Sequence, residues 1–317
     1  MTEIFSNLYL IMSKLVIFGA TGQQGRSILD TVHNDPNLSK QYSIRAITRD
    51  TSQSAAKEIA KQGIETIQAD ASDPASLPAA LENAHTVIII TTTTYDADLK
   101  AREYSQVKAV GDAAVAAGAK YIIFSTAVHS AALWNGRAVD AFDSKAEAEE
   151  YLRSLPLKTA FFAPSMFMQN LTTMMAPVPG PDGTYTIASV ISPDTQIPLI
   201  DVAHDSGKYI AAILADPENT AGITLHAATG LYSFAEIAAI ISRVSGKTVN
   251  YVKIPEEVYA GFMEPEQGAR VASMMRFFEE VGYFGPNTPK LVDRTVKMVK
   301  AKLTTFEEFA GKYLVNI

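Results

Sequence analysis

The sequence contains no cysteine, and this absence excludes several kinds of chemistry at once. A chain without thiols cannot form disulfides, use a thiolate nucleophile, or bind zinc or an iron–sulfur cluster through cysteine. The sequence also lacks an apolar stretch near the roughly 20 residues that cross a bilayer, and it lacks the pattern of a cleaved signal peptide. We therefore expect a cytoplasmic protein that makes no membrane contact.

Clustered positive charge is missing as well. The formal net charge is −7, and no long run of Lys and Arg occurs. A surface that binds nucleic acid directly needs concentrated basic residues because it must neutralise phosphates, so we expect no direct nucleic-acid binding. The histidines and carboxylates do not show the spacing of a zinc site, so we also expect no catalytic metal.

What the sequence does contain is a strand, a tight turn and a helix near its start. Four apolar residues, 15–18, lead into three glycines with the spacing G-x-x-G-x-x-G, and a helical pattern follows. Gly19 permits the sharp turn, Gly22 leaves no Cβ between backbone and phosphate, and Gly25 lets the helix pack closely on the strand. Amides at a helix N-terminus bind a pyrophosphate, so the pattern predicts a dinucleotide site. The residues that we expect at the pyrophosphate are Gly19, Thr21, Gly22, Gln23, Gln24 and Gly25.

Strand-like and helical patterns alternate along the first half of the chain. The expected strands cover 14–18, 43–48, 65–68, 86–90, 120–124 and 158–162, and the expected helices lie near 23–33, 53–62, 74–82, 97–117 and 139–154. Such alternation with short connections gives right-handed crossovers and a parallel sheet covered by helices on both faces. The sequence therefore predicts an α/β fold with a doubly wound parallel sheet, a Rossmann domain over residues 13–163, preceded by an extension at 1–12.

Prolines become frequent after residue 163, and the helical periodicity weakens. We expect residues 164–317 to form a smaller mixed α/β lobe that lies over the carboxyl ends of the strands and is partly interleaved with the Rossmann sheet. The methionine-rich segment 166–175 suits the wall of a cleft for a small apolar substrate, because methionine adapts its shape. Irregular core packing is the alternative interpretation of the same segment.

Two residues at the end of the second expected strand bear on the choice of nucleotide. An arginine at this position pairs with the 2′-phosphate of NADP, whereas an acid binds the free 2′-hydroxyl of NAD. Arg49 lies at about the expected interval after the glycines and favours NADP(H). Asp50 follows directly, so NAD(H) remains the alternative.

Polar residues also follow the third and fourth expected strands. Asp70, with Ala71 beside it, is placed to accept a hydrogen bond from the adenine amino group. Thr91 and Thr92 begin a run of threonines that we expect to border the ribose and nicotinamide end of the cofactor. A plain loop role is the alternative for both sets.

In combination these features resemble the short-chain dehydrogenase/reductase superfamily and, within it, the atypical NmrA-like branch. The segments that carry the resemblance, in order along the chain, are 19–25, the Arg49 loop, 142–151, 162–170, 200–202 and 305–309. The resemblance implies that Ser125 and Lys145 occupy the positions of the superfamily's catalytic serine and lysine. It further implies that Lys145 and Pro164 border the cofactor.

The sequence departs from the superfamily at the proton donor. Working members carry a tyrosine four residues before the lysine, on the same helix face, and the lysine lowers the pKa of that tyrosine. Here Ala141 stands in the tyrosine position. Lys145 by itself is the first remaining candidate acid or base, as in reductases that resemble isoflavone and pinoresinol reductase. His129 and Tyr95 are further candidates, because both could project over the nicotinamide.

Two functions follow from this departure, and the sequence leaves the choice between them open. The first is an NADP(H)-binding, redox-responsive regulator of a protein partner such as a transcription factor, acting in the cytoplasm or also in the nucleus. The second is an NADPH-dependent reductase that uses Lys145 to reduce a small apolar carbonyl, quinone or enone. A non-redox lyase or isomerase is a third, minor alternative. The expected interaction surfaces of a regulator are segments 261–266 and 274–278. Core packing is the alternative interpretation of 274–278, because it holds two Met and two Phe.

Overall fold

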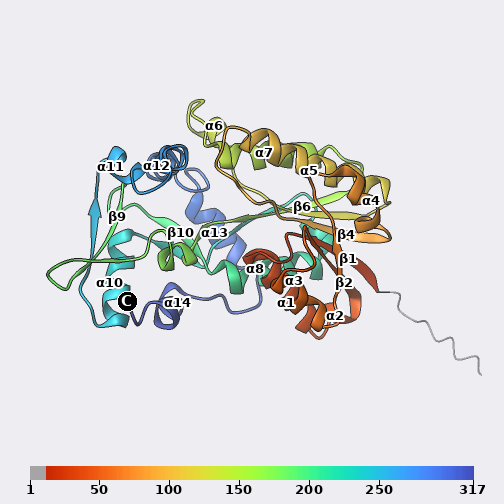
Figure 1. Cartoon of the computed structure of the whole chain (residues 1–317), viewed down its shortest axis with the longest axis horizontal. Coiled ribbons are helices and arrows are strands. Elements are labelled where there is room, and N and C mark those ends of the chain that lie inside the picture. Colours follow the sequence, from red (N-terminus) through yellow and green to blue (C-terminus); the bar gives the residue numbers. More distant parts are fainter. Residues whose placement is uncertain (1–11) are drawn as a thin grey trace, which may run out of the picture.

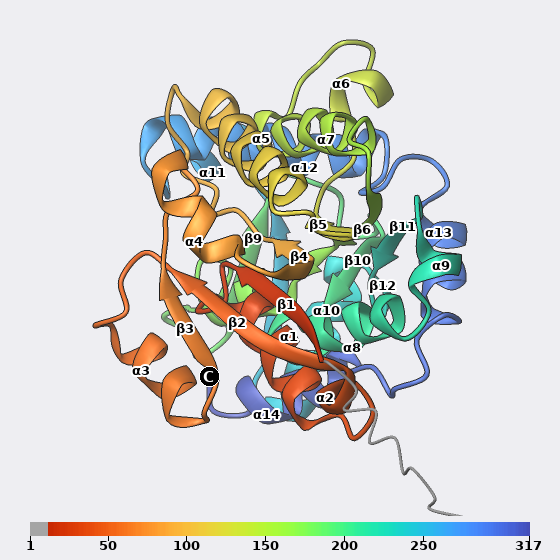
Figure 2. The ribbon, with the colours of Figure 1, turned by 90° about the vertical axis from the view of Figure 1, so that its right-hand side faces the viewer.

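The computed structural model describes residues 12–317, and the extension expected at 1–12 lies almost wholly outside the described residues. A seven-stranded parallel sheet forms the largest layer, with the strand order β11-β6-β5-β4-β1-β2-β3 (Figure 2). Its strands are β1 (Ser13–Phe18), β2 (Tyr42–Thr48), β3 (Glu65–Gln68), β4 (Ala84–Ile89), β5 (Tyr121–Ser125), β6 (Lys158–Pro164) and β11 (Thr224–Ala227). This arrangement confirms the predicted doubly wound α/β fold.

Helices cover both faces of this sheet, as a buried parallel sheet requires. One face carries α1 (Gln23–Asn34), α2 (Leu38–Gln41), α3 (Ser54–Lys61) and α8 (Val202–Ala215). The other carries the 3-10 turn η1 (Pro74–Ser76), α4 (Leu77–Leu81), α5 (Leu99–Ala116) and α7 (Asp140–Arg153). Because the central strands are covered on both sides, residues 15–18 of β1 and 121–124 of β5 are continuous runs of buried apolar residues rather than alternating ones. The helical segment expected near 74–82 begins as η1 at Pro74, where the Asp73 carboxylate accepts from the Ala75 amide at 3.1 Å.

The order of the strands reverses between β1 and β4, and such a switch point opens a crevice at the carboxyl ends of the strands. Gly19 makes the turn out of β1 with φ +77°, a conformation that favours glycine. A Cβ added at Gly19 would also lie 2.8 Å from the carbonyl oxygen of Ile90, at the end of β4. The backbone therefore fixes the glycine loop directly beside the crevice.

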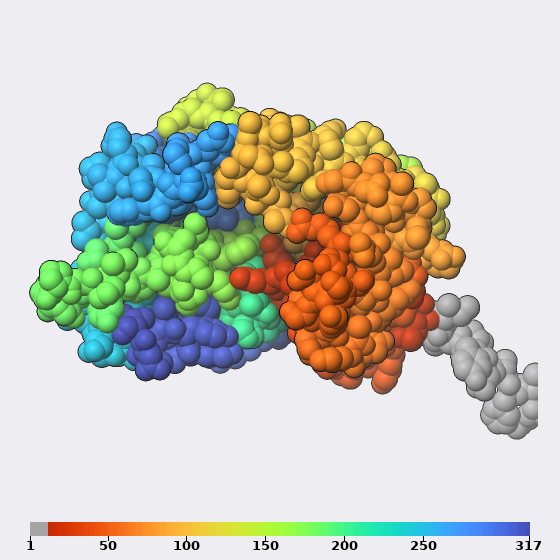
Figure 3. All heavy atoms as spheres, viewed as in Figure 1, coloured from red at the N-terminus to blue at the C-terminus, as the bar shows by residue number. Residues whose placement is uncertain are grey.

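The second half of the chain forms a smaller lobe of two three-stranded sheets and several helices (Figure 1). The strands are β7 (Met166–Phe167), β8 (Val178–Pro179), β9 (Tyr185–Ser189), β10 (Ile197–Ile200), β12 (Gly230–Tyr232) and β13 (Val249–Lys253). The helices are η2 (Met168–Thr172), α10 (Phe234–Ser245), α11 (Glu256–Ala260), α12 (Pro265–Glu280), α13 (Thr288–Val296) and α14 (Phe306–Tyr313); the short helices α6 (Ser130–Leu133) and α9 (Pro217–Thr220) connect larger elements. In the space-filling view, the green and blue segments of this lobe lie beside the red and orange segments of the Rossmann layer (Figure 3).

Two elements from the second half of the chain complete the Rossmann layer. Strand β11 pairs in parallel with β6 and becomes the edge of the large sheet. Helix α8 packs against α1, and the Gly207 amide donates to the Ser27 hydroxyl across this contact at 3.0 Å. The helix that opens the predicted dinucleotide site thus rests on residues far away in sequence.

Most methionines of the segment 166–175 lie in core rather than on a cleft wall, although Met174 is 55 % exposed. Met166, Met168 and Met175 are all buried in the apolar core of the smaller lobe. Met275, from one of the two candidate interaction segments, is buried in the same core. The structure therefore favours the core-packing interpretation for both segments.

Candidate functional site

The glycine loop and the start of α1 form a cradle that suits an anion. Helix α1 begins after Gly22, and within the described chain no side chain caps its first turn. The amides of that turn are therefore available to a ligand. A Cβ at Gly25 would lie 2.2 Å from the Gly19 carbonyl oxygen, so the close packing of this turn requires glycine. A Cβ at Gly22 would meet only that oxygen, at 3.4 Å, so the protein's own packing leaves the space beside Gly22 open.

The residues at the end of β2 differ in how they are engaged. The Asp50 carboxylate accepts from the Ser52 amide at 2.8 Å and from the Gln53 side chain at 2.9 Å. These hydrogen bonds lower the pKa of Asp50. Arg49 is exposed and forms no ion pair with any residue of 12–317. The Asp50 carboxylate is thus hydrogen-bonded within its own turn, whereas the Arg49 side chain is exposed just after the end of β2.

The predicted adenine and ribose residues also line up along the ends of the strands. Asp70 is half-buried, and its carboxylate accepts from the Ser72 amide at 2.8 Å, so it braces the loop that also holds Ala71. Thr92 is exposed, but the hydroxyl of Thr91 is buried without a hydrogen-bond partner in the described chain. Buried polar atoms are normally paired, so the unpaired Thr91 hydroxyl fits a site that a polar ligand completes.

The Ser125 side chain links the end of β5 to the first turn of α1. It lies at the end of β5, and its hydroxyl donates to the side-chain oxygen of Gln24 at 2.7 Å. Gln24 belongs to the first turn of α1, so the phosphate cradle and the serine position are directly joined. The sequence placed Gln24 at the pyrophosphate and Ser125 at the catalytic serine position, but it did not indicate this contact.

Lys145 is held by a buried carboxylate that sequence reasoning missed. Its Nζ lies 2.8 and 2.7 Å from the two carboxylate oxygens of Glu103 and 2.8 Å from the Thr93 hydroxyl. Only 1 % of Glu103 is exposed. Burial lowers the pKa of the Lys145 ammonium, and the adjacent carboxylate opposes that shift. A signal existed in the sequence, because Glu103 lies on the apolar stripe of α5 between Leu99 and Val107.

Ala141, whose side chain has no acidic proton, occupies the position of the expected tyrosine. Ala141 is buried in the first turn of α7, and its carbonyl oxygen accepts from Lys145 at 3.3 Å. Of the neighbouring hydroxyls, Tyr95 is mostly buried, and burial raises its pKa, which makes it a weaker acid. Tyr283 donates to the Pro164 carbonyl oxygen at 3.3 Å, and burial raises its pKa too. His129 faces the buried Asp143 carboxylate at 3.4 Å.

An open pocket of about 700 Å³ lies next to the Lys145 cluster. One wall is the loop after β4, and the other is the N-terminal turn of α12 together with the residue before it. The lining residues are Thr93, Thr94, Tyr95, Glu264, Pro265, Glu266 and Gln267. An ion pair between Arg270 of α12 and Asp140 of α7 joins the two lobes nearby. The pocket therefore has one aromatic side chain and an acidic rim.

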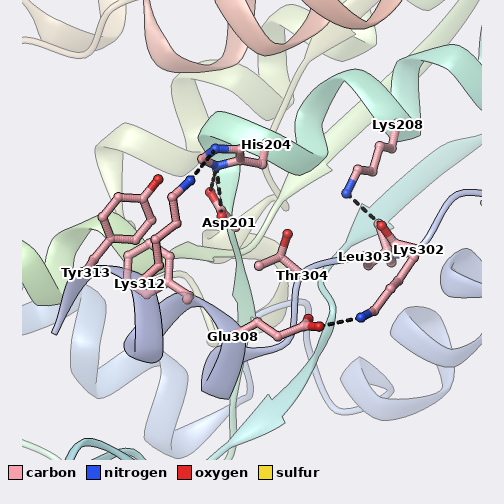
Figure 4. A pocket seen from close by; sticks show the side chains of 10 residues that line it. Asp201, His204, Lys208, Lys302, Leu303, Thr304, Glu308, Lys312 and Tyr313 are labelled. Atoms are coloured by element: carbon pink, nitrogen blue, oxygen red, sulfur yellow. Dashed lines mark hydrogen bonds and ion pairs between the residues drawn. The ribbon is translucent and has the colours of Figure 1, made fainter. Parts of the chain in front are cut away.

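A second pocket, of about 290 Å³, lies between the start of α8 and α14 (Figure 4). Its polar groups bond to one another: Asp201 pairs with His204 at 3.0 Å, and Lys312 contacts the other ring nitrogen of His204 at 3.4 Å. Asp201 also accepts from the Gln169 side chain at 2.6 Å. These contacts fasten the C-terminal helix to α8, and Asp201 braces the start of α8.

Trp134 has a packing role, since it is buried and its indole nitrogen donates to Glu280 at 2.8 Å. Across residues 12–317, no group of three His, Asp or Glu side chains could hold a metal ion. The same residues include no helix that is both long and apolar enough to span a bilayer.

Comparison with known proteins places this architecture in a family. An NmrA-like family domain-containing oxidoreductase, lnaB, of Aspergillus flavus is 26% identical over 293 residues, which cover 86% of each chain. The crystal structure of NmrA, a negative transcriptional regulator in complex with NADP, superposes with a TM-score of 0.80 at 22% identity and covers 96% of this chain and 95% of that chain. The triphenylmethane reductase of Citrobacter sp., complexed with NADP(H), has a TM-score of 0.79 at 20% identity and covers 95% of this chain and 100% of its own. The model of the NmrA-like family matches residues 12–310, and the chain belongs to this family.

Proposed function

We propose that this protein binds NADP(H) and acts as a redox-responsive regulator of a protein partner such as a transcription factor. The cradle at Gly22 would hold the pyrophosphate, Arg49 the 2′-phosphate, and Thr91 the sugar and nicotinamide end. Arg49 supports NADP(H) over NAD(H) because it is exposed while Asp50 is committed to its own turn. Regulation of a transcription factor implies that the protein acts in the cytoplasm and in the nucleus.

One observation supports the regulator proposal most strongly. The cleft keeps the glycine cradle for a dinucleotide, but the catalytic tyrosine is replaced and the side chains of the serine and lysine are hydrogen-bonded to other residues. Ala141 replaces the tyrosine, Lys145 is bound to Glu103, and Ser125 is bound to Gln24. General acid catalysis needs a donor that can reach the substrate with a suitable pKa. A nucleotide sensor needs only the cradle.

An exposed surface for a partner supports the same proposal. Phe262, from the candidate segment 261–266, is 66 % exposed, and Val258 of the preceding helix is 49 % exposed. Exposed apolar side chains of this size suit contact with a protein partner if they form one patch. The structural neighbour NmrA is itself named as a transcriptional regulator.

Titration calorimetry with NADPH, NADP⁺, NADH and NAD⁺ tests the nucleotide part of the proposal. We expect both NADP forms to bind more tightly than the NAD forms. NADPH oxidation is then followed against quinones, aldehydes, enones and a cationic triarylmethane dye. Binding without turnover of any acceptor supports a sensor, and absence of binding by all four nucleotides contradicts the proposal.

A reductase is the second candidate, and the 700 Å³ pocket beside Thr93 and Tyr95 is the observation that favours it. Bound NADPH would supply a hydride, and the acceptor would then take its proton from Lys145 or from water, or would need none. Several relatives are named as oxidoreductases, which supports this alternative. Turnover of one acceptor class that is lost in Lys145→Ala would establish it, whereas full activity of that variant would remove Lys145 from the mechanism.

A further inference from the structure

We propose that Glu103 is a positioning residue for Lys145, which keeps the ammonium charged and fixes it at the cleft edge of α7. The assignment of a cofactor to this cleft rests on the proposed function, but the link between the two side chains rests on their contacts alone.

The contacts saturate the lysine. An ammonium has three N–H donors, and the Nζ of Lys145 is within 2.8 Å of both Glu103 oxygens and of the Thr93 hydroxyl. Glu103 is saturated in turn, because it also accepts from the hydroxyls of Thr93 at 2.7 Å and Ser144 at 2.5 Å. The carboxylate thus joins α5, α7 and the loop after β4 at one buried point.

Holding two helices together does not require this arrangement. Burying an ion pair sacrifices the hydration of both charges, and an apolar pair of similar size usually stabilises a fold at least as well. Helices α5 and α7 already share apolar contacts, and a surface ion pair between Lys100 and Glu147 also joins them, at 2.6 Å. The buried pair is therefore better explained by what it does to Lys145 than by what it does for the helix packing.

No other charged group near the pair can replace Glu103. Arg102, which directly precedes Glu103 on α5, is bound to Asp96. Burial, with the Glu103 carboxylate, raises the pKa of Tyr95 in the loop after β4, so its hydroxyl stays neutral. Asp143, on the same helix as Lys145, accepts from the Ser130 amide and hydroxyl at 2.5 and 2.8 Å. Glu103 is thus the only carboxylate within the described chain that contacts the ammonium of Lys145.

The direct test is an NMR titration of protein labelled with 13C at the lysine ε-carbons, with Lys145→Arg used to assign the resonance. In Glu103→Gln we expect the pKa of Lys145 to fall by at least about 1 unit relative to wild type, because desolvation then acts without compensation. Glu147→Gln, which removes the surface pair between the same two helices, is the matched control and leaves the Lys145 titration unchanged. An unchanged titration in Glu103→Gln overturns the proposal.

A conservative variant covers the case in which Glu103→Gln does not fold. Glu103→Asp keeps the charge and shortens the side chain, so we expect a smaller downward shift of the same pKa. A wild-type titration in Glu103→Asp, together with wild-type nucleotide affinity, also contradicts the positioning role.

Nucleotide binding provides a readout that a purely structural pair would not move. As pH rises through the Lys145 titration, we expect the NADPH affinity of Glu103→Gln to fall about tenfold more than that of wild type, since its lysine loses the charge earlier. Equal pH profiles of the two proteins contradict the proposal. If no variant and no wild-type protein binds nucleotide, the proposed function fails, and the NMR titration still decides the role of Glu103.

Discussion

At Gly22, what the fold requires can be distinguished from what a bound phosphate would require. Its φ of −80° and ψ of 173° are accessible to any residue, and a Cβ there has only one neighbour, at 3.4 Å. The fold therefore does not need glycine at this position, whereas a phosphate placed on the first-turn amides of α1 does.

The variant Gly22→Val separates these two requirements. We expect NADPH affinity to fall at least about a hundredfold, because the side chain occupies the space beside the amides. Calorimetry measures the binding, and urea unfolding is expected to show a free energy within about 1 kcal/mol of wild type. Unchanged affinity would remove the cradle from the cofactor site.

Arg49 carries the predicted choice between the two nucleotides. In Arg49→Ala we expect NADPH to bind about 10- to 100-fold more weakly, since charge-assisted hydrogen bonds to the 2′-phosphate are lost, while NADH affinity changes little. Arg243→Ala, which removes an exposed arginine paired with Glu307 in the smaller lobe, is the control. An equal effect of Arg49→Ala on both nucleotides would reverse the preference.

Among the elements, the contact between α1 and α8 determines how the dinucleotide helix is held. A Cβ at Gly207 would lie 2.0 Å from the Thr31 hydroxyl and 2.3 Å from the Ser27 carbonyl oxygen. The two helices can be this close only because position 207 has no side chain.

We therefore expect Gly207→Ala to lower the free energy of unfolding by about 2 kcal/mol or more, because the helices must separate. Chemical denaturation measures the change. Gly311→Ala in α14, where an added Cβ meets nothing within 4 Å, is the matched helical control and is expected to be neutral or slightly stabilising. Equal stability of the two variants would mean that the α1–α8 contact adjusts easily.

Some strands of the fold could be predicted from the sequence, and others could not. Strands β1 and β5 could be predicted because burial on both faces leaves an uninterrupted apolar run. Strands β7 and β8 have two residues each, too few to form a periodic pattern. The pairing of β11 with β6 depends on a long-range contact that no local pattern encodes. We propose that the boundary between the two parts lies near residue 163, with α8 and β11 as later segments that complete the first part.

The contacts within the candidate site could be predicted from the sequence only in part. The glycine loop, Ser125 and Lys145 follow from spacing or from the family resemblance. The partners of these residues depend on how helices pack, so Gln24 opposite Ser125 and Glu103 opposite Lys145 emerged only with the structure. Even so, an acid within the apolar stripe of α5 was a readable sign that a buried cation lay opposite.

For the molecule as a whole, His226 couples stability to pH. It lies on β11, and its ring packs edge-on against Phe284 with centroids 4.9 Å apart. Burial, with a contribution from Arg294, lowers its pKa from 6.5 to about 4. As pH falls, the unfolded chain binds a proton at His226 at a higher pH than the folded protein does. The stability that the neutral, buried His226 contributes is therefore complete above about pH 6.5 and is lost as pH falls toward 4.

We expect this histidine to account for a loss of about 3 kcal/mol of unfolding free energy between neutral pH and pH 4. Urea unfolding of wild type and His226→Phe at both pH values measures it, and the variant should lose less stability on acidification. His33→Gln, at an exposed histidine, serves as the control. The same pH dependence in His226→Phe and wild type would assign the acid sensitivity to other groups.

The return of α8 and β11 to the Rossmann layer has a consequence for synthesis. A ribosome completes β6 well before it produces residues 202–227, so the emerging chain at that stage lacks the partner of α1 and leaves the outer edge of β6 unpaired. The dinucleotide cradle therefore acquires its full support late in translation. On the proposed function, a bound nucleotide would stabilise finished chains more than prematurely terminated ones, and cellular nucleotide supply would favour intact protein over its own fragments.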